Sequence, residues 1–448
     1  GIITYETTTT MHALHMFSLS LFFLLSLAHS HDPAASSLSF PLTSRPRSPS
    51  TARSSLSERM LAAAQPRRNV YAAKYSMALI VSLPVGTPAQ DQQMVLDTGS
   101  QLSWIHCNDR RQTPQSRGSD ESSVPMSFFN PTVSSSFSPV PCNTLICKPT
   151  VPDFTVPTVC DQKKLCSYSY FYADGTLAEG NLVADRIALS PSPLVLGCAA
   201  GSADDYGILG MNMGRLSVLS QSKITKFSYC VPSRLSRASP SATGAFLIGD
   251  NPVAATLKYV PLMTFPSSLS IRMPNLDPLA YTVPMKAIRV GAATLNISVS
   301  TFRPNAGGSG QTFVDSGSEL TYLVEEAYER VREAVGKVVG PMMKSGFSFG
   351  GVADMCFDEK NEAFVEKRIG GIGLEFDGGV EIAIEPGSVL TDVGDGVKCV
   401  AIGRSSMIGS AANIIGNVHQ QNLWVEYDLA ARRMGFGKAD CSKSLARQ

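Results

Sequence analysis

The stretch MVLDTGSQLSW, residues 94–104, has a second copy in TFVDSGSELTY, residues 312–322. When Asp97 is aligned with Asp315, the copies agree at Asp, Gly, Ser and Leu, and a hydroxyl residue follows each Asp. Apolar residues precede both Asp residues, which predicts a strand leading into each acidic turn. The two Asp residues lie 218 positions apart in a chain of 448 residues, so each half carries one copy.

Each copy combines the residue types that let a carboxylate lie in a partly buried turn. Glycine permits a sharp turn and the close approach of a second backbone. Hydroxyl groups satisfy a carboxylate without adding charge, and a buried Asp without such partners is costly. The predicted supporting residues of the two carboxylates are Thr98, Gly99, Ser100, Ser316, Gly317 and Ser318.

A second feature also occurs in both halves. Residues 208–210 read ILG and residues 414–416 read IIG, which places an apolar-apolar-Gly segment about 100 residues after each Asp. Two matched features in the same order indicate that a whole lobe has been duplicated.

The length and composition agree with two lobes made mostly of strands. A chain of 448 residues exceeds the size of one ordinary hydrophobic core. Short apolar runs are interrupted by many of the 36 Gly and 28 Pro residues, which favours β structure. The net charge of +1, with dispersed Lys and Arg, argues against nucleic acid as a partner.

Local patterns predict several elements. Apolar runs and one aromatic-rich repeat around ADGT predict two strands and a hairpin, and periodic apolar residues predict one long helix and one short one. The predicted strands cover residues 75–83 and 92–96, the hairpin 164–189, and the helices 325–340 and 216–222. Residues 233–278 contain few regular patterns and are expected to carry the connection between the two lobes.

The N-terminal residues 11–30 are predicted to be a signal peptide. Residues 16–27 are apolar but too short to span a bilayer, and small residues follow them up to a cleavage point near Ser30. No second long apolar run and no lipid-anchor signal are present. We therefore expect a protein of the secretory pathway without a membrane anchor, extracellular or apoplastic, with the vacuole and the endoplasmic reticulum as alternatives.

Residues 31–69 are predicted to be a propeptide or a linker. The segment is rich in Ser, Pro, Ala and Arg, and residues 31–68 carry a net charge of +4. A disordered linker has this composition, and so has a basic propeptide that binds acidic groups until they are protonated. Arg67-Arg68 marks a candidate processing site of such a zymogen.

Ten cysteines in a secreted chain predict five disulfide bonds rather than a metal site. Both halves contain an odd number, so at least one bond must join them if all are paired. Cys441 then pairs with Cys198 or Cys230, and Cys356 with Cys399. The remaining cysteines are Cys107, Cys142, Cys147, Cys160 and Cys166, whose spacing is poor for metal ligation.

Specific motifs in both halves resemble those of one known family. They are DTGSQLSW, FNPTVSSSFSPVPC, YADGTLAEGNL, VLGC, KFSYC, DSGSELTY and IIGNVHQQNLWVEYDLAARRMGFGKADC. Over residues 75–441 the chain resembles the pepsin-like aspartic proteases, and within them the plant nepenthesin-type, or atypical, branch. The resemblance implies an all-β, bilobal fold with few short helices, an N-terminal lobe over 70–250, a C-terminal lobe over 251–448 and a cleft between them.

The same resemblance assigns roles to residues. Asp97 and Asp315 would be the catalytic pair that activates water, with no cofactor and no metal. Tyr172, with Asp174 and Gly175, would belong to a flap that closes over the substrate, and Trp104 would orient Tyr172. Tyr170 is an alternative flap tyrosine, and Ala173 stands where the family usually has Gly.

The resemblance also implies the substrate. Members of the family cleave proteins or peptides between bulky apolar residues, so we expect an acid-active, monomeric endopeptidase. The alternative is a non-proteolytic binding protein on the same fold, similar to the xylanase inhibitors, although such proteins tend to lose one catalytic motif. Asn296 begins the single glycosylation sequon of the chain.

Overall fold

The computed structural model describes residues 37–46, 77–107, 128–147, 157–172, 176–202, 205–234 and 242–444. Residues 38–448 are assigned to one compact unit, to which all the elements below belong. The predicted signal peptide and most of the predicted propeptide or linker lie outside the described residues.

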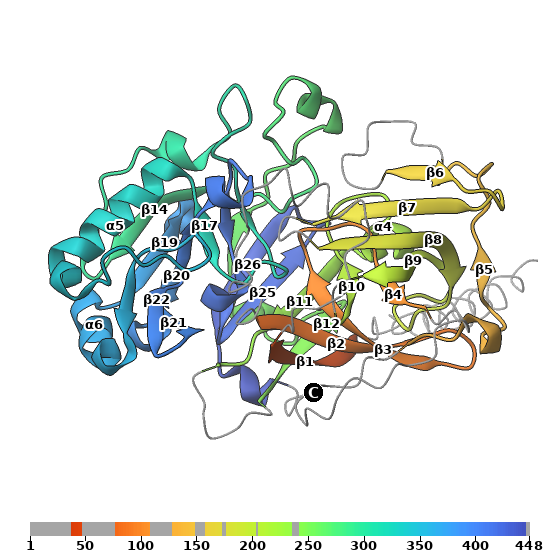
Figure 1. Ribbon diagram of the computed structural model, residues 1–448, viewed down its shortest axis with the longest axis horizontal. Helices are drawn as coiled ribbons and strands as arrows, with labels where there is room; N and C mark the ends of the chain where they lie inside the picture. The colour runs from red at the N-terminus through yellow and green to blue at the C-terminus, as the bar shows by residue number, and fades with distance from the viewer. Residues whose placement is uncertain are drawn as a thin grey trace, which may run out of the picture. The chain divides into compact units, whose positions relative to one another are not determined.

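Strands dominate the structure, with 26 strands and three α-helices among the described residues (Figure 1). Up to residue 248 the strands are β1 (Leu38–Pro46), β2 (Met77–Val85), β3 (Gln90–Asp97), β4 (Trp104–His106), β5 (Ser138–Pro139), β6 (Thr158–Cys160), β7 (Cys166–Phe171), β8 (Leu177–Asp185), β9 (Leu194–Ser202), β10 (Gly207–Gly210), β11 (Lys226–Cys230) and β12 (Thr243–Ile248). After it they are β13 (Lys258–Pro261), β14 (Met285–Val290), β15 (Ala293–Thr294), β16 (Thr312–Val314), β17 (Thr321–Leu323), β18 (Cys356–Asp358), β19 (Ile372–Phe376), β20 (Glu381–Ile384), β21 (Leu390–Gly394), β22 (Val397–Val400), β23 (Ile402–Arg404), β24 (Asn413–Ile415), β25 (Leu423–Asp428) and β26 (Arg433–Lys438). The helices are α4 (Val218–Ser222), α5 (Glu325–Val339) and α6 (Glu362–Ile369).

One 15-stranded sheet connects the two halves of the chain. Its order is β13-β26-β25-β11-β12-β1-β2-β3-β10-β4-β9-β8-β7-β6, with β5 paired to β8. The pairing of β11 with β25 is the point at which first-half and second-half strands meet. Three smaller sheets, with the orders β15-β14-β19-β20, β16-β24-β17-β23 and β18-β22-β21, belong to the second half.

The acidic turns occupy the same topological position in both halves. In the first half β10 runs parallel to β3 and antiparallel to β4, with Ile208 opposite Trp104. In the second half β24 runs parallel to β16 and antiparallel to β17, with Ile414 opposite Tyr322. The apolar-apolar-Gly segments therefore lie beside the strands that deliver the two Asp residues.

Most of the predicted elements are confirmed. The strand predicted at 75–83 overlaps β2 from Met77 onward, the strand predicted at 92–96 lies within β3, the hairpin is β7–β8, and the short helix is α4. The long helix is α5, whose buried residues include the predicted apolar positions Ala327, Val331, Val335 and Val339. Two acidic residues in its first turn and Lys337 in its last turn suit the helix dipole. No helix within the described residues has the length and apolar character needed to cross a bilayer.

The interpretation of residues 233–278 as a largely irregular connection is wrong in part. This range contains β12, which lies inside the large sheet between β11 and β1, and β13, which lies at its edge. The sequence TGAFLI of β12 is buried almost throughout, so it lacks the alternation of a half-exposed strand. The helix α6 was also not predicted; it lies near α5 (Figure 1).

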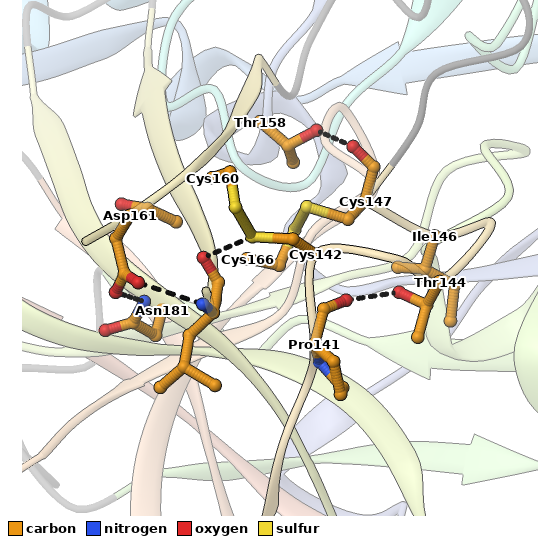
Figure 2. The surroundings of a disulfide bond; sticks show 12 residues. Pro141, Cys142, Thr144, Ile146, Cys147, Thr158, Cys160, Asp161, Cys166 and Asn181 are labelled. Atoms are coloured by element: carbon orange, nitrogen blue, oxygen red, sulfur yellow. Dashed lines mark hydrogen bonds between the residues drawn. A yellow bond between two sulfur atoms is a disulfide. The ribbon is translucent and has the colours of Figure 1, made fainter. Parts of the chain in front are cut away.

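The five predicted disulfide bonds are present. Cys441 pairs with Cys230, not with Cys198, and Cys356 pairs with Cys399. The other bonds are Cys107–Cys198, Cys142–Cys160 and Cys147–Cys166. Figure 2 shows the last two bonds side by side, where they fasten the turn after β5 to β6 and β7. The Cys230–Cys441 bond joins β11 to the C-terminal segment and so links the two halves covalently.

The strand β1 falls within the range predicted to be a propeptide or linker. It pairs with β12 on one side and β2 on the other, so it is an interior strand of the large sheet. Leu42 is fully buried in the main hydrophobic core, whereas Leu38 is 38% exposed. The sequence did not predict this strand, because the frequent Ser, Pro and Arg residues of β1 are not typical of a strand.

We predict that Leu42→Ala lowers the free energy of unfolding of the purified protein by about 2–4 kcal/mol, because it leaves a cavity in the core. Leu38→Ala in the same strand is the control, and its effect should stay below about 1 kcal/mol. Urea unfolding of both variants measures the free energies, and N-terminal sequencing checks that the purified proteins contain β1. Equal stability of the two variants would show that β1 is not part of the folded protein.

Candidate active site

Asp97 and Asp315 meet although they are far apart in the chain. Asp97 is the last residue of β3, and Asp315 directly follows β16. Both are buried, at 7% and 8% exposure, and their carboxyl groups are hydrogen-bonded to each other. A hydrogen bond between two carboxyl groups requires one proton, so the pair shares a proton and titrates as a unit.

The glycines of the two turns allow this approach. A methyl group at Gly99 would lie 2.8 Å from Oδ2 of Asp315, and a methyl group at Gly317 would lie 2.2 Å from Oδ1 of Asp97. Each glycine therefore packs against the carboxylate of the other half. Any larger residue at either position would push the two carboxyl groups apart.

Neutral donors surround the carboxylate of Asp97. The backbone N–H of Gly99 donates to Oδ1 at 2.9 Å, and the hydroxyl of Ser100 donates to Oδ2 at 2.5 Å. These bonds orient the carboxylate without placing a positive charge beside it.

The same arrangement surrounds Asp315. The N–H of Gly317 donates to Oδ1 at 2.8 Å, and the hydroxyl of Ser318 donates to Oδ2 at 2.6 Å. Burial raises the pKa of Asp315 above its ordinary value, and the bonds from Ser318 and Gly317 partly oppose this increase.

A reciprocal pair of hydrogen bonds holds the two turns together. The N–H of Thr98 donates to Oγ of Ser316 at 3.0 Å, and the N–H of Ser316 donates to Oγ1 of Thr98 at 2.9 Å. The hydroxyl of Ser316 also donates to the carbonyl of Leu96 at 2.7 Å. All three residues are buried, so these bonds replace water for backbone groups on both sides.

The predicted flap tyrosine lies near this pair. The indole Nε1 of Trp104 donates to the hydroxyl of Tyr172 at 2.7 Å, as expected if Trp104 orients Tyr172. Burial raises the pKa of Tyr172, with further contributions from Tyr170 and from the charge of Asp97. The ring of the alternative residue, Tyr170, contacts Tyr172 edge to face with centroids 4.6 Å apart.

The turn of the predicted flap hairpin is not described, and the predicted glycosylation site is exposed. The N–H of Tyr172 donates to the carbonyl of Thr176 at 2.9 Å and so connects the two strands of the hairpin. Asp174 and Gly175, between them, lie outside the described residues. Asn296 is exposed after β15, which leaves its amide accessible.

The sequence did not predict an ion pair next to the second turn. Nη1 of Arg234 lies 2.8 Å from Oε1 of Glu319, whose Oε2 accepts the N–H of Met77 at 2.9 Å. Nε of Arg234 also donates to Ser44 in β1 at 3.1 Å. Comparison of the two copies could have indicated this ion pair, because the charged Glu319 stands where the first copy has the neutral Gln101.

Family models match both halves of the chain. Residues 79–250 match the family described as Xylanase inhibitor N-terminal, and residues 280–438 match the family described as Xylanase inhibitor C-terminal. The first match contains Asp97 and the second contains Asp315, so each acidic turn lies in its own matched region.

Named relatives are similar over most of their length. Aspartic proteinase PCS1 of Arabidopsis thaliana is 35% identical over 83% of this chain and 83% of its own. Aspartic proteinase nepenthesin-2 of Nepenthes gracilis is 30% identical over 82% of this chain and 78% of its own.

Solved structures share the fold at low sequence identity. The crystal structure titled edgp aligns with a TM-score of 0.59 and 17% identity, covering 92% of this chain and 96% of that one. Basic 7S globulin from soybean aligns with a TM-score of 0.57 and 14% identity, covering 91% and 99%. This likeness confirms the predicted all-β, bilobal fold.

The raised pKa of Asp315 predicts a pH-dependent stability. The folded state holds the proton of Asp315 more tightly than the unfolded chain, so stability falls as the pH rises from 3.8 through the raised pKa. We expect Asp315→Asn to be more stable than the wild type at neutral pH, and this advantage to disappear in acid. Unfolding free energies measured across this range test the prediction.

Asp91→Asn is the control for the loss of one charge, because Asp91 is exposed at the other end of β3. A stability difference for Asp315→Asn that does not change with pH would contradict the raised pKa.

Proposed function

The chain belongs to the pepsin-like aspartic protease family, in its plant branch, and from this we propose that it is an aspartic endopeptidase that hydrolyses peptide bonds at acid pH. The observation that carries the proposal is the hydrogen bond between the carboxyl groups of Asp97 and Asp315. Both turns keep their complete set of donors, which favours catalysis over binding alone.

The mechanism follows from one proton shared by two carboxyl groups. The ionised member takes a proton from a water molecule, whose oxygen attacks the carbon of the peptide carbonyl. The protonated member donates its proton to the carbonyl oxygen, which gives a neutral tetrahedral diol. Collapse of the diol breaks the C–N bond, and the amine leaves with a proton from the pair. No side chain becomes acylated, so the reaction requires no Ser or Cys nucleophile.

The donors that hydrogen-bond to Asp97 and Asp315 preserve the charge and the orientation that the reaction needs. Neutral hydroxyl and N–H groups stabilise a single negative charge without neutralising it, so one carboxylate remains able to act as a base. The reciprocal bonds between Thr98 and Ser316 fix the distance between the carboxyl groups before substrate binds.

The substrate and the surroundings of the enzyme are proposed on the family resemblance. The substrate is a protein or peptide bound in extended form, cleaved between bulky apolar residues, with Tyr172 closing over it. The N-terminal lobe is assigned to residues 70–250 and the C-terminal lobe to 251–448. The protein acts as a monomer in the secretory pathway or outside the cell, and Asn296 is a candidate for glycosylation.

A second candidate function is supported by the descriptions of the matched families. Both name xylanase inhibitors, so the chain is also a candidate for a protein that binds a glycoside hydrolase without cleaving peptides. The two functions differ in a measurable way, because only the protease needs both carboxyl groups.

We expect the purified protein to cleave a denatured protein between about pH 3 and pH 5, and pepstatin to inhibit the cleavage. Asp97→Asn and Asp315→Asn should each lower kcat at least about 1,000-fold, because an amide can neither accept nor share the proton.

Folded variants with unchanged activity would exclude the proposed mechanism. A wild-type protein that binds xylanase tightly and cleaves no peptide would establish the alternative function.

The contact between Trp104 and Tyr172 gives a second prediction. Tyr172→Phe removes the hydroxyl that accepts the indole N–H, so the flap should close less precisely and kcat/KM should fall about tenfold. Tyr168→Phe, on the strand β7 that ends just before Tyr172, is the matched control, because the hydroxyl of Tyr168 is buried without a hydrogen bond among the described residues. Equal activity of the two variants would show that Tyr172 does not have the proposed role in the flap.

A further inference from the structure

The two halves support the backbone of their Asp residues in different ways. In the first half the N–H of Met211 donates to the carbonyl of Asp97 at 2.9 Å. The next residue, Asn212, donates its N–H to the carbonyl of Ser100 at 3.0 Å. Two consecutive backbone donors therefore follow Gly210 and hold the first turn.

After Gly416 the second half has one residue fewer than the Met211–Asn212 pair that follows Gly210. Asn417 directly follows Gly416, and its N–H already donates to the carbonyl of Ser318 at 2.8 Å. Among the described residues, no backbone N–H takes the place of Met211 at the carbonyl of Asp315. The side chain of Gln420 supplies the donor instead, with its Nε2 3.3 Å from this oxygen.

The orientation of the Gln420 amide is fixed by its partners. Its Nε2 lies between two carbonyl oxygens, those of Asp315 and Ile415, the latter at 2.9 Å, so it must donate to both. Its Oε1 therefore faces the other way and accepts the hydroxyl of Tyr229 at 2.6 Å. Gln420 and Tyr229 are both fully buried, so water does not compete for these groups.

A chain of hydroxyl groups continues from Tyr229. Because the single hydroxyl hydrogen of Tyr229 goes to Gln420, the hydroxyl of Tyr427, 3.0 Å away, donates to Tyr229. The hydroxyl of Thr98 in turn lowers the pKa of Tyr427 by acting as a hydrogen-bond donor to it. The oxygen of Thr98 accepts the N–H of Ser316, so all four groups have a defined direction of donation.

This chain closes on a single peptide bond. The carbonyl that accepts Gln420 and the N–H that donates to Thr98 belong to the same peptide, the one between Asp315 and Ser316. Both polar groups of that peptide are thereby held by one ring of hydrogen bonds. The ring crosses between the halves four times, because Thr98 and Tyr229 belong to the first half and Gln420 and Tyr427 to the second.

Aromatic packing makes the ring rigid. Tyr229 and Tyr427 lie on the paired strands β11 and β25. Phe227 stacks on Tyr427 at 4.3 Å, and Tyr281 meets it edge to face at 4.5 Å. Burial raises the pKa of both Tyr229 and Tyr427, so their hydroxyls remain neutral donors throughout the acid range.

We propose that Gln420, Tyr229 and Tyr427 are positioning residues for the catalytic reaction. They hold the peptide after Asp315 so that the next donors, the N–H of Gly317 and the hydroxyl of Ser318, stay directed at its carboxylate. The proposal rests on the proposed function and adds a device that acts on the second carboxyl group alone.

The test compares Gln420→Met and Tyr427→Phe with the wild type. Both substitutions keep the shape of the side chain and open the ring at different points. We expect each to lower kcat about tenfold with KM within about twofold, because the carboxylate is misoriented but substrate contacts are kept. Loosened donors also raise the pKa of Asp315, so the limb of the pH–rate profile set by the pair should move upward by about half a unit. The double variant should lose no more activity than the less active of the two single variants, because one substitution already opens the ring.

Two control variants separate positioning from stability. Gln421→Met removes the hydrogen bonds of the adjacent Gln to the carbonyl of Val418 and the N–H of Arg234. Tyr328→Phe removes a buried hydroxyl that bonds to Asp354. Neither contacts the peptide after Asp315, so both should keep the wild-type kcat and pH profile.

Variants of Gln420 and Tyr427 with a wild-type kcat per folded molecule and an unchanged pH profile would overturn the proposal, as would additive losses in the double variant. If the wild type cleaves no peptide, the proposed function fails separately. The ring is then tested by the pH dependence of unfolding with and without Asp315→Asn, in which Gln420→Met should move the titration of Asp315 upward and Gln421→Met should not.

Discussion

The hydrogen bond between the carboxyl groups of Asp97 and Asp315 sets the requirements for the surrounding structure. Two carboxyl groups in contact and away from water can share one proton, but ionising both would place two negative charges together in a medium that screens them poorly. Positive side chains would relieve this repulsion, yet they would also remove the basicity that the proposed chemistry needs. The structure uses neutral N–H and hydroxyl donors instead, and glycine at the two positions where each turn touches the opposite carboxylate.

Such a site demands that two halves be held together accurately. The reciprocal bonds between Thr98 and Ser316 act at the carboxyl groups themselves. Beneath them, the large sheet continues from β11 to β25 without a break, and the Cys230–Cys441 bond joins the same region covalently. The ring through Gln420 connects these levels, because it uses tyrosines from the paired strands to hold the peptide next to Asp315. Accuracy at the site therefore depends on the sheet as well as on the turns.

Around the two Asp residues the duplication is exact in strand pairing and inexact in chemistry. Parallel and antiparallel pairings around the two Asp strands correspond strand for strand. The halves differ at the flap hairpin, at Glu319 with its ion pair to Arg234, and at the missing backbone donor that Gln420 replaces. Each difference lies close to the carboxyl pair, so two chemically identical groups are placed in different surroundings.

The sequence alone determined the features that depend on local pattern and on counting. Two Asp-hydroxyl-Gly turns after apolar runs predicted a duplicated lobe, and the family resemblance implied that their carboxylates form a pair. Periodicity predicted α5, and the odd number of cysteines in each half required a bond between halves if all are paired. Tertiary structure decided everything that depends on contacts between distant residues. It chose Cys230 over Cys198 as the partner of Cys441, because only Cys230 lies on the strand beside the C-terminal segment. It placed β1 between β12 and β2, partners that are far away in the chain, and it buried β12, whose sequence lacks the alternation of a half-exposed strand. It also brought Gln420, Tyr229 and Tyr427 to the peptide after Asp315, and no local pattern distinguishes these residues from ordinary buried ones, because their role exists only where the two halves meet.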